Sequence, residues 1–527
     1  MIDLFEDELL PEGDALLDDD FFGLDDFDFS DDIFEEKPEP FKPILSSWKW
    51  LAKYRVPFRQ HNEAFDAIYY DHINHTGIYS PTGSGKTFLR NAIVEVSLWA
   101  HDQNIIISDR KLDSIGFLLP QDPAYMTNRA YFPNPRTGKF VLRPDCLPRD
   151  RFHLWLPATD FSYIDPLVRE LMEWGVVKWY RFHPRLFIES TLSDYIPHSV
   201  GMTQIESLAT QRAITKAKGT IISEEMKENW SLELLQQFIE DQKQLTAMSK
   251  PYQKMMILQD SGIISKERTV ELIDREKGTR EQEKVVVLRN FNEIIKSKTQ
   301  TKQDPTSHLH VFCNKYMSSS AIDNTLSTCI NFLIFGMIRE SCENIHKKKR
   351  VICHLPEAEY SLSKHSSENQ NDKIRNYFGA LYGNALRETR QYQLYHFLDT
   401  QQVTELPSNI TSNQLTLWLM PGFKDKSEVS WLQAGVGRAY LDKYSLQELF
   451  SMKNPIENRG FAFYIGSDKA VKVWTRPRQT YHFKEGDDPV YLLKKYRNTF
   501  GIENSRPWVR WDENISNEQE DVDYGNL

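Results

Sequence analysis

Cysteine is scarce in this chain of 527 residues: there are five, scattered along the sequence, and no two of them form a CxxC pair. Their spacing predicts neither a disulfide framework nor a zinc site, and it suits a reducing, cytoplasmic compartment. Long apolar runs are also missing. The longest, Cys329 to Ile338, falls far short of the roughly 20 residues that a membrane span needs, so we expect no membrane partner. The N-terminus begins acidic, without a basic and then apolar stretch, which argues against a signal peptide.

Basic residues are nearly absent from both ends of the chain. Residues 1–42 carry 17 acidic side chains against two lysines, and the stretch after Trp511 carries six acids and no base. Because the whole chain has a net charge of -11, the body between these ends carries about +10. A mildly basic body leaves a nucleic-acid partner open. The first 43 residues are predicted to form a disordered acidic tail, whose acids and phenylalanines suit docking on a basic surface or on a protein partner.

The most specific pattern in the sequence is a phosphate-binding loop. It reads Ser80-Pro81-Thr82-Gly83-Ser84-Gly85-Lys86-Thr87 and continues into Phe88. In such a loop the glycines let successive backbone N–H groups point at phosphates, the lysine adds a positive charge, and the following helix adds its dipole. The sequence therefore predicts that Ser80 to Phe88 bind ATP and that the Thr87 hydroxyl ligates Mg²⁺. Ser80 stands at the motif's usual first glycine, but the tight turn lies later.

The segments around this loop predict an α/β fold. A strand at Gly77 to Tyr79, a helix at Thr87 to Ala100 and a strand at Asn104 to Ser108 form the opening of an α/β sheet. Similar sequence returns later in the chain. There we predict helices at Ala321 to Asn344 and Asp372 to Arg390, and strands at Arg350 to Leu355, Tyr395 to Thr400 and Leu415 to Met420.

The segment between these two parts is predicted to be a mostly helical insertion, residues 112–300. It includes a strand at Arg151 to Pro157 and several amphipathic helices, among them SLELLQQFIEDQKQLTAM and SKERTVELIDREKG. The resulting division is a disordered tail at 1–43, the core in two parts at 44–111 and 301–490 around the insertion at 112–300, and a C-terminal extension with an acidic end at 491–527.

Hydrolysis of ATP needs an acidic group at the end of another strand, to hold magnesium and to polarise the attacking water. The run VICHLPEAEY, residues 351–360, is an apolar strand that ends beside Glu357, the candidate for this acid. Pro356 stands where an acid on the magnesium side is expected. Glu359 or Asp109 are alternatives for that position, or magnesium is held mainly by Thr87 and water.

A further strand ends in Asp399-Thr400-Gln401-Gln402, where an amide can sense the γ-phosphate. SPTGSGKT, SDRK, HLPEAEY and RETRQYQLYHFLDTQQVTELPSNITSNQ together resemble the FtsK–HerA superfamily of P-loop ATPases, especially its HerA-like and conjugative coupling members. The matching residues are about a fifth of the chain, with a weaker likeness of Phe461 to Phe483 to the family's closing β-segment. The 112–300 insertion matches nothing in the family.

The resemblance implies a RecA-like P-loop core in a ring-forming motor, a homo-hexamer, that hydrolyses ATP to translocate double-stranded DNA. It implies that Lys86 and Glu357 are catalytic, that Gln401 is the sensor, and that Arg390 reaches the nucleotide of a neighbouring subunit. The cofactors that it implies are ATP and Mg²⁺.

Two other functions stay open. Arg59-Gln60 and Glu63-Ala64 resemble the upstream glutamine motif of superfamily 2 helicases, although no DExD/H box follows. Pro356 favours a nucleotide-dependent scaffold or switch with weak hydrolysis. The basic clusters His346 to Arg350 and Arg476-Pro477-Arg478 are each consistent with DNA contact or with a solvated surface.

Overall fold

The computed structural model describes residues 50–55, 65–69, 74–81, 83–99, 103–119, 131–133, 140–142, 146–147, 149–189, 195–221, 223–231, 234–235, 237–238, 251–296, 307–317, 321–345, 350–365, 369–414, 416–423, 427–428, 430, 461–466, 470–475, 478, 480–484 and 486–500. The predicted acidic tail, most of the predicted helix at 231–248, the basic residues 346–349 and the helicase-like residues 59–64 lie outside these ranges.

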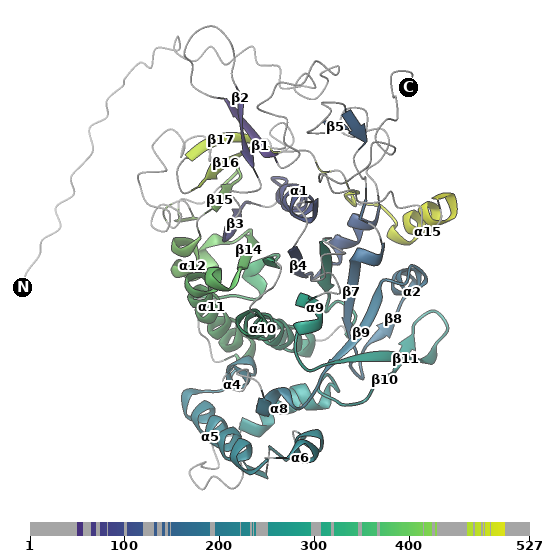
Figure 1. Ribbon diagram of the computed structural model, residues 1–527, viewed down its shortest axis with the longest axis vertical. Coiled ribbons are helices and arrows are strands. Elements are labelled where there is room, and N and C mark those ends of the chain that lie inside the picture. Colours follow the sequence, from purple (N-terminus) through teal and green to yellow (C-terminus); the bar gives the residue numbers. More distant parts are fainter. Residues whose placement is uncertain are drawn as a thin grey trace, which may run out of the picture. The chain divides into compact units, whose positions relative to one another are not determined.

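A single sheet of fifteen strands runs through the described residues (Figure 1). Its central part is parallel, and neighbouring strands follow the order β15-β3-β14-β13-β4-β12. These strands are β15 (Thr416–Leu419), β3 (Thr76–Tyr79), β14 (Leu394–Thr400), β13 (Arg350–Leu355), β4 (Gln103–Ser108) and β12 (His308–Phe312). All the predicted core strands are present, and their carboxyl ends lie at one edge of the sheet.

Helices cover both faces of this parallel part. Along β4, Ile105 and Ile107 pack with α1 (Lys86–Trp99) on one face, whereas Ile106 faces α10 (Ala321–Asn344) and α11 (Gln370–Glu388). Figure 1 shows α1 on one side of the sheet and α10 and α11 on the other. Burial on both faces explains why the strands are continuous apolar runs. The predicted RecA-like α/β P-loop fold is confirmed.

The segment 112–300 differs from its prediction, because it adds strands to the main sheet beyond β12. In spatial order these are β7 (Phe152–Pro157), β9 (Val177–Phe182), β11 (Thr279–Leu288), β10 (Thr269–Asp274) and β8 (Tyr163–Ile164). The segment also contains the helices α2 (Pro166–Glu173), α3 (Leu186–Glu189), α4 (Ile196–Ser199), α5 (Gln204–Thr220), α6 (Glu224–Glu228), α8 (Pro251–Asp260) and α9 (Asn292–Lys296).

The helix predicted for SKERTVELIDREKG is wrong. Residues 269–274 form β10, whose side chains alternate between exposed and buried, and a turn at Gly278 leads into β11. Alternation with a period of two is the pattern of a half-buried strand, and the many charged residues of this stretch obscured it.

Antiparallel strands complete the other end of the sheet. They are β16 (Phe461–Ile465), β17 (Ala470–Thr475), β1 (Trp50–Arg55) and β2 (Phe65–Tyr69), joined to β15 through β16. Helix α15 (Pro489–Phe500) follows, and its Arg497 pairs with Glu170 of α2 at 2.8 Å. The remaining elements are α12 (Ser408–Asn413) and a separate hairpin of β5 (Tyr131–Pro133) and β6 (Phe140–Leu142). Among the described helices, none is long and apolar enough to cross a bilayer.

Candidate nucleotide-binding site

The predicted phosphate loop connects β3 to the first turn of α1. Gly83 and Gly85 have φ values of 86° and 90°, a left-handed backbone that glycine adopts without steric cost. A side chain at Gly83 would meet no other atom within 4 Å, so this side of the loop is open. The N–H groups of Phe88 and Leu89 both donate to the Gly85 carbonyl and start the helix. The loop thus has the turn and the open side that a phosphate cradle needs.

Serine at the motif's first position has a structural role. The Ser80 side chain is fully buried and contacts the hydroxyl of Ser84, and both hydroxyls also donate to the carbonyl of Pro81, at 3.0 and 2.9 Å. The backbone N–H of Ser80 donates to Thr400 of β14 at 3.2 Å. Ser80 therefore ties the start of the loop to the neighbouring strand. Thr82 lies outside the described residues.

Lys86 forms a buried ion pair with Asp399, the next-to-last residue of β14. The two side chains are 6% and 0% exposed, and Lys86 Nζ lies 2.8 Å from Asp399 Oδ1. Among the described residues, however, no group makes an aligned hydrogen bond with this ammonium. A buried ammonium normally needs hydrogen bonds as well as a counter-charge. The site therefore fits an anion with oxygen acceptors, such as the phosphates of ATP.

Asp399 is surrounded by groups that favour its ionised form. His354 lies 3.2 Å from Asp399 Oδ2, the Glu357 N–H donates to Oδ1 at 3.1 Å, and Arg90 lies 3.9 Å from Oδ2. Burial alone raises the pKa of Asp399, but Lys86, His354 and Arg90 together hold this pKa well below its usual range. Burial lowers the pKa of His354 despite the nearby carboxylate, so its ring is neutral and donates from Nε2.

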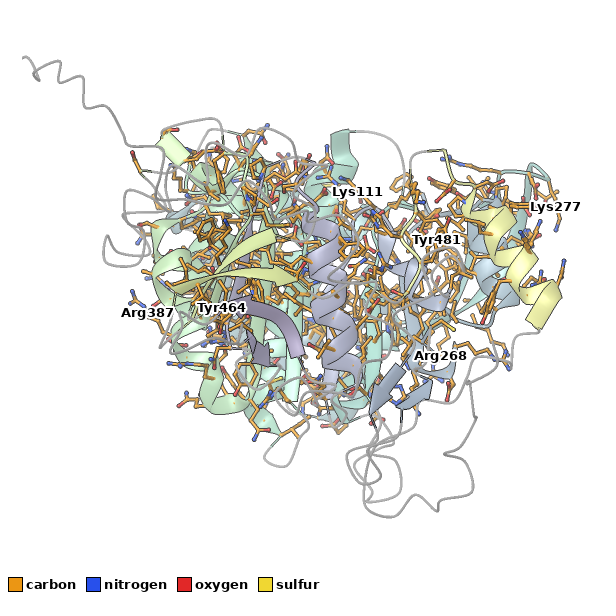
Figure 2. The ribbon with its side chains drawn as sticks, turned by 90° about the horizontal axis from the view of Figure 1, so that it is seen from above. Lys111, Arg268, Lys277, Arg387, Tyr464 and Tyr481 are labelled. Carbon is orange, nitrogen blue, oxygen red and sulfur yellow. The ribbon has the colours of Figure 1, made fainter. Side chains whose placement is uncertain are left out.

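Glu357 is the second residue after β13, close to the strand end as predicted, but its carboxylate faces Lys111. Its backbone is left-handed, with φ 48° and ψ 52°, which is uncommon for a residue other than glycine. The carboxylate accepts from the Lys111 ammonium, and Lys111, which is labelled in Figure 2, lies in the loop after β4. Burial lowers the pKa of Lys111, but the bond and charge of Glu357 outweigh this effect and raise it. Glu357 therefore contacts the site through its backbone N–H, which donates to Asp399, while its carboxylate is bonded to Lys111.

Asp109, one alternative for the missing acid, is occupied by the backbone of its own loop. Its Oδ1 accepts from the N–H groups of Lys111 and Leu112 at 3.0 and 2.8 Å, and its Oδ2 accepts from Ser114 at 2.8 Å. These bonds hold a turn in which Leu112 has φ 66°. Asp109 shapes the loop that carries Lys111, and its oxygens are engaged there.

Glu359, the other alternative, lies beside the predicted sensor. Its Oε1 accepts from the backbone N–H of Gln401 at 3.4 Å, and its Oε2 is buried without a hydrogen bond to any described residue. Burial raises the pKa of Glu359, partly offset by the charge of Lys86. Next to it is a polar hollow of about 380 Å³, lined by residues that include Pro356, Glu359 and Gln402. The structure thus brings Gln401, Glu359 and Lys86 into one neighbourhood.

Arg390 lies at the opposite edge of the sheet from the phosphate loop. It is exposed, in the 3-10 turn Thr389–Tyr392 that precedes β14. Because β14 runs parallel to β3, its first residue lies a full strand, about 20 Å, from the level of the loop. Arg387 in the preceding helical turn is likewise peripheral in Figure 2. The structure does not bring Arg390 to the phosphate loop of its own chain.

From the sequence alone, no role in the site was predicted for Asp399, His354, Arg90 or Lys111, although Asp399 and Lys111 lie in segments singled out above. A signal was present for two of them: Asp399 is an acid inside an apolar strand, and Arg90 lies four residues after Lys86 on the same helix face. Of the basic pair 476 and 478, Arg478 is neither DNA-facing nor solvated. It is 1% exposed, and its guanidinium lies 3.7 Å from the buried Glu95 of α1.

Magnesium has no protein-built cage among the described residues, where no cluster of three or more His, Cys, Asp or Glu side chains could hold a metal ion. Magnesium is usually bound by one or two protein ligands together with substrate phosphates and water. Thr87 is half-buried at the start of α1, and its hydroxyl is the ligand that the motif predicts.

No protein-family model matches the chain, and no curated protein sequence matches it either. Several solved structures do match. VirB4 of Thermoanaerobacter pseudethanolicus is 11% identical and has a TM-score of 0.45, and the match covers 81% of this chain and 96% of VirB4. The bacterial conjugative coupling protein TrwB is 12% identical with a TM-score of 0.42, covering 82% of this chain and 95% of TrwB.

The conjugation coupling protein TcpA of pCW3, solved with ATPγS, is 10% identical with a TM-score of 0.27, covering 87% of this chain and 73% of TcpA. Conjugative coupling proteins are thus among the matches. They are also the type of protein that the sequence resembles.

Proposed function

We propose that the chain is an ATPase that couples ATP hydrolysis to the movement of double-stranded DNA, and that it works as a ring, with a homo-hexamer as the expected assembly. The phosphate loop is the observation that carries the proposal. Its glycines have the left-handed backbone of a phosphate cradle, and its buried Lys86 has a counter-charge but no aligned hydrogen bond among the described residues. Triphosphate oxygens would supply the missing acceptors.

In this proposal ATP binds with Mg²⁺, which offsets the charge on the phosphates. Lys86 and the N–H groups of the loop would hold the phosphates, and the Thr87 hydroxyl would be a ligand of the metal. Glu357 polarises the attacking water, and Gln401 senses the γ-phosphate. Gln401 follows β14, the neighbour of β3, and Glu357 follows β13, one strand further along, both at the carboxyl edge of the sheet where ligands of open α/β sheets bind.

The ring is supported by the position of Arg390. An arginine finger must contact the phosphates, but this side chain lies at the far edge of the sheet from its own loop. If Arg390 acts in hydrolysis, it acts on the nucleotide of a neighbouring subunit. The DNA partner is supported by the positive charge of the body, about +10, and by the family resemblance of the sequence.

The test is steady-state ATP hydrolysis with and without duplex DNA, combined with native mass measurement. Duplex DNA should stimulate turnover, and ATP should shift the mass to that of a ring. Lys86→Ala should abolish nucleotide binding or turnover, and hydrolysis at the parental rate by this variant would contradict the proposal. A helicase would in addition separate the strands of a duplex, which the proposed motor does not.

A second candidate is a nucleotide-dependent switch that hydrolyses ATP slowly. It is favoured by the proline at position 356 and by the bond that ties the Glu357 carboxylate to Lys111. A switch binds ATP as tightly as the motor does, but its turnover is not stimulated by duplex DNA. The same assay therefore separates the two candidates.

A further inference from the structure

Pro356 leaves β13 without an acid at the place where one on the magnesium side is expected. Proline has no charge, and no backbone N–H to offer a phosphate or a water. The residue after it, Glu357, is bonded through its carboxylate to Lys111. If the chain binds Mg-ATP as proposed above, the role of this acid is open to another residue.

The register of the sheet places an acid beside the proline. Leu355 of β13 pairs with Leu398 of β14, so the next residues, Pro356 and Asp399, stand at the same level on neighbouring strands. On its other side Asp399 pairs with Ile78 of β3, two residues before the phosphate loop. Asp399 therefore lies one strand closer to the loop than position 356.

The side chain of Asp399 also projects from the correct face of the sheet. Alternate residues of a strand share a face, and Phe397 packs in the same core as Ile78 and the helix α1. The ring of His354 stacks on Phe397 at 4.3 Å and reaches Asp399 Oδ2 from this same side. The carboxylate thus points toward the side of the sheet on which α1, with Lys86 and Thr87, is packed.

The contacts of Asp399 are of two kinds: three fix its position in the protein, and the fourth is with the phosphate-loop lysine. His354, Arg90 and the Glu357 N–H hold the carboxylate from the protein side. Lys86, the remaining neighbour, is the residue that phosphates would recruit. When Lys86 turns to the phosphates, Asp399 Oδ1 becomes available beside them.

We propose that Asp399 replaces the acid that is absent at position 356. In the nucleotide-free protein it holds Lys86 in the site, and in the nucleotide-bound protein it acts with Thr87 on the magnesium of Mg-ATP. Magnesium takes oxygen ligands and is commonly bound by one or two protein groups together with phosphates and water, which is what this site offers. In this proposal the acid stands on β14 instead of β13, at the same level of the sheet.

The test is the effect of magnesium on nucleotide affinity, measured by titration with a fluorescent ATP analogue in Mg²⁺ and in EDTA. The wild-type protein should bind more tightly in Mg²⁺. In Asp399→Asn the enhancement of affinity by Mg²⁺ should fall by about 10- to 100-fold, the loss that is typical when a group supporting a metal site is replaced. Its affinity in EDTA should be unchanged or higher, because Lys86 is released from its ion pair. The double variant Pro356→Asp/Asp399→Asn should regain part of the enhancement.

The matched control is Asp113→Asn, which removes the other carboxylate near Arg90, at 4.0 Å. It should keep the magnesium effect. An undiminished magnesium effect in Asp399→Asn would overturn the inference. If Asp399→Asn does not fold, Asp399→Glu keeps the charge but displaces the carboxylate by one methylene, and an unweakened magnesium effect there would equally overturn it. Failure of the wild-type protein to bind ATP in either buffer would instead refute the proposed nucleotide binding itself.

Discussion

Lys111 and Glu357 form an ion pair at the ends of two adjacent parallel strands, β4 and β13. The lysine is largely exposed and the glutamate is 11% exposed, so solvent reaches the pair from the lysine side. Glu357 also donates its backbone N–H to Asp399, the partner of Lys86. The residue that carries the proposed catalytic carboxylate is thus bonded directly to the partner of Lys86. Its carboxylate, however, is paired with the Lys111 cation, which nucleotide binding would have to displace.

Glu357→Gln should keep ATP binding and stall hydrolysis. An amide cannot polarise the attacking water as a carboxylate does, and the loss of a general base typically costs about 10²- to 10⁴-fold in rate. Glu359→Gln is the matched variant two residues away and should have a milder effect. The measurement is single-turnover hydrolysis with binding monitored separately. Equal and small effects from both variants would place the catalytic acid elsewhere.

Arg390→Ala should be nearly inactive alone and still bind ATP, because a finger supplied to a neighbour contributes on the order of 10³-fold or more in rate. Mixed with Lys86→Ala protein, it should recover partial activity, since some interfaces then combine an intact loop with an intact finger. Arg387→Ala, three residues earlier and also exposed, serves as the control. No recovery at any ratio, in rings shown to contain both variants, would contradict a shared site.

Glu95→Ala should destabilise the protein by about 3–5 kcal/mol, because it leaves the buried Arg478 without its counter-charge. Glu95 is fully buried in α1 and accepts from both the N–H and the hydroxyl of Thr480, at 2.8 and 2.6 Å. Burial lowers the pKa of Arg478 to about 10 despite the nearby Glu95. The measurement is urea unfolding. Thr480→Ser keeps the hydroxyl and should lower the free energy of unfolding much less than Glu95→Ala does. If the two variants lower it equally, the hydroxyl bond is not what matters.

The protein should lose stability as the pH falls from 6.5 toward 3, in part through His75. Burial, with a smaller contribution from Arg390, lowers the pKa of His75 to about 3, whereas an unfolded histidine titrates near 6.5. Between these values the unfolded chain binds more protons, so stability rises with pH, by at most about 1.4 kcal/mol per pH unit for this group. In the fold, His75 Nδ1 accepts from the His396 N–H at 3.0 Å and must be unprotonated.

The measurement for His75 is the midpoint of urea unfolding at several pH values between 4.5 and 7.5. His75→Gln retains a hydrogen-bond acceptor but does not titrate, so its stability should depend less steeply on pH. A slope identical to that of the wild-type protein would assign the acid sensitivity to other buried histidines, such as His310 and His396.

The phosphate loop and the strands around it were predictable because their signals are local. Gly83, Gly85 and Lys86 lie within a few residues of one another, and the apolar runs of β4 and β13 have the length and composition of buried strands. The part that Asp399 plays was not predictable. It depends on the pairing of β14 with β13 and β3, and this register joins Leu398 to Leu355, 43 residues away, and Asp399 to Ile78, 321 residues away.

Errors elsewhere have the same origin. In β10, Glu271 is exposed and Asp274 is buried on the opposite face, while the apolar Ile273 is exposed. Charge and apolar character therefore did not mark the two faces of the strand, which its pairing with β11 establishes. Arg478 carries a charge in a polar-looking stretch, yet the fold buries it against Glu95, which is far away in the sequence. Charge is a weak guide to exposure when a distant residue supplies the counter-charge.

The bond between Thr480 and Glu95 spans 385 residues of the chain, and this separation has a consequence for biosynthesis. At typical elongation rates of 5–20 residues per second, the ribosome needs roughly 20 to 80 s to make the partner of Glu95 after the helix itself. During that interval the Glu95 carboxylate is exposed to water, and α1 lacks its contacts with Arg478 and Thr480. A nascent chain therefore completes the packing of α1 only after Thr480 has been made, and a message truncated before codon 480 yields a polypeptide that never does.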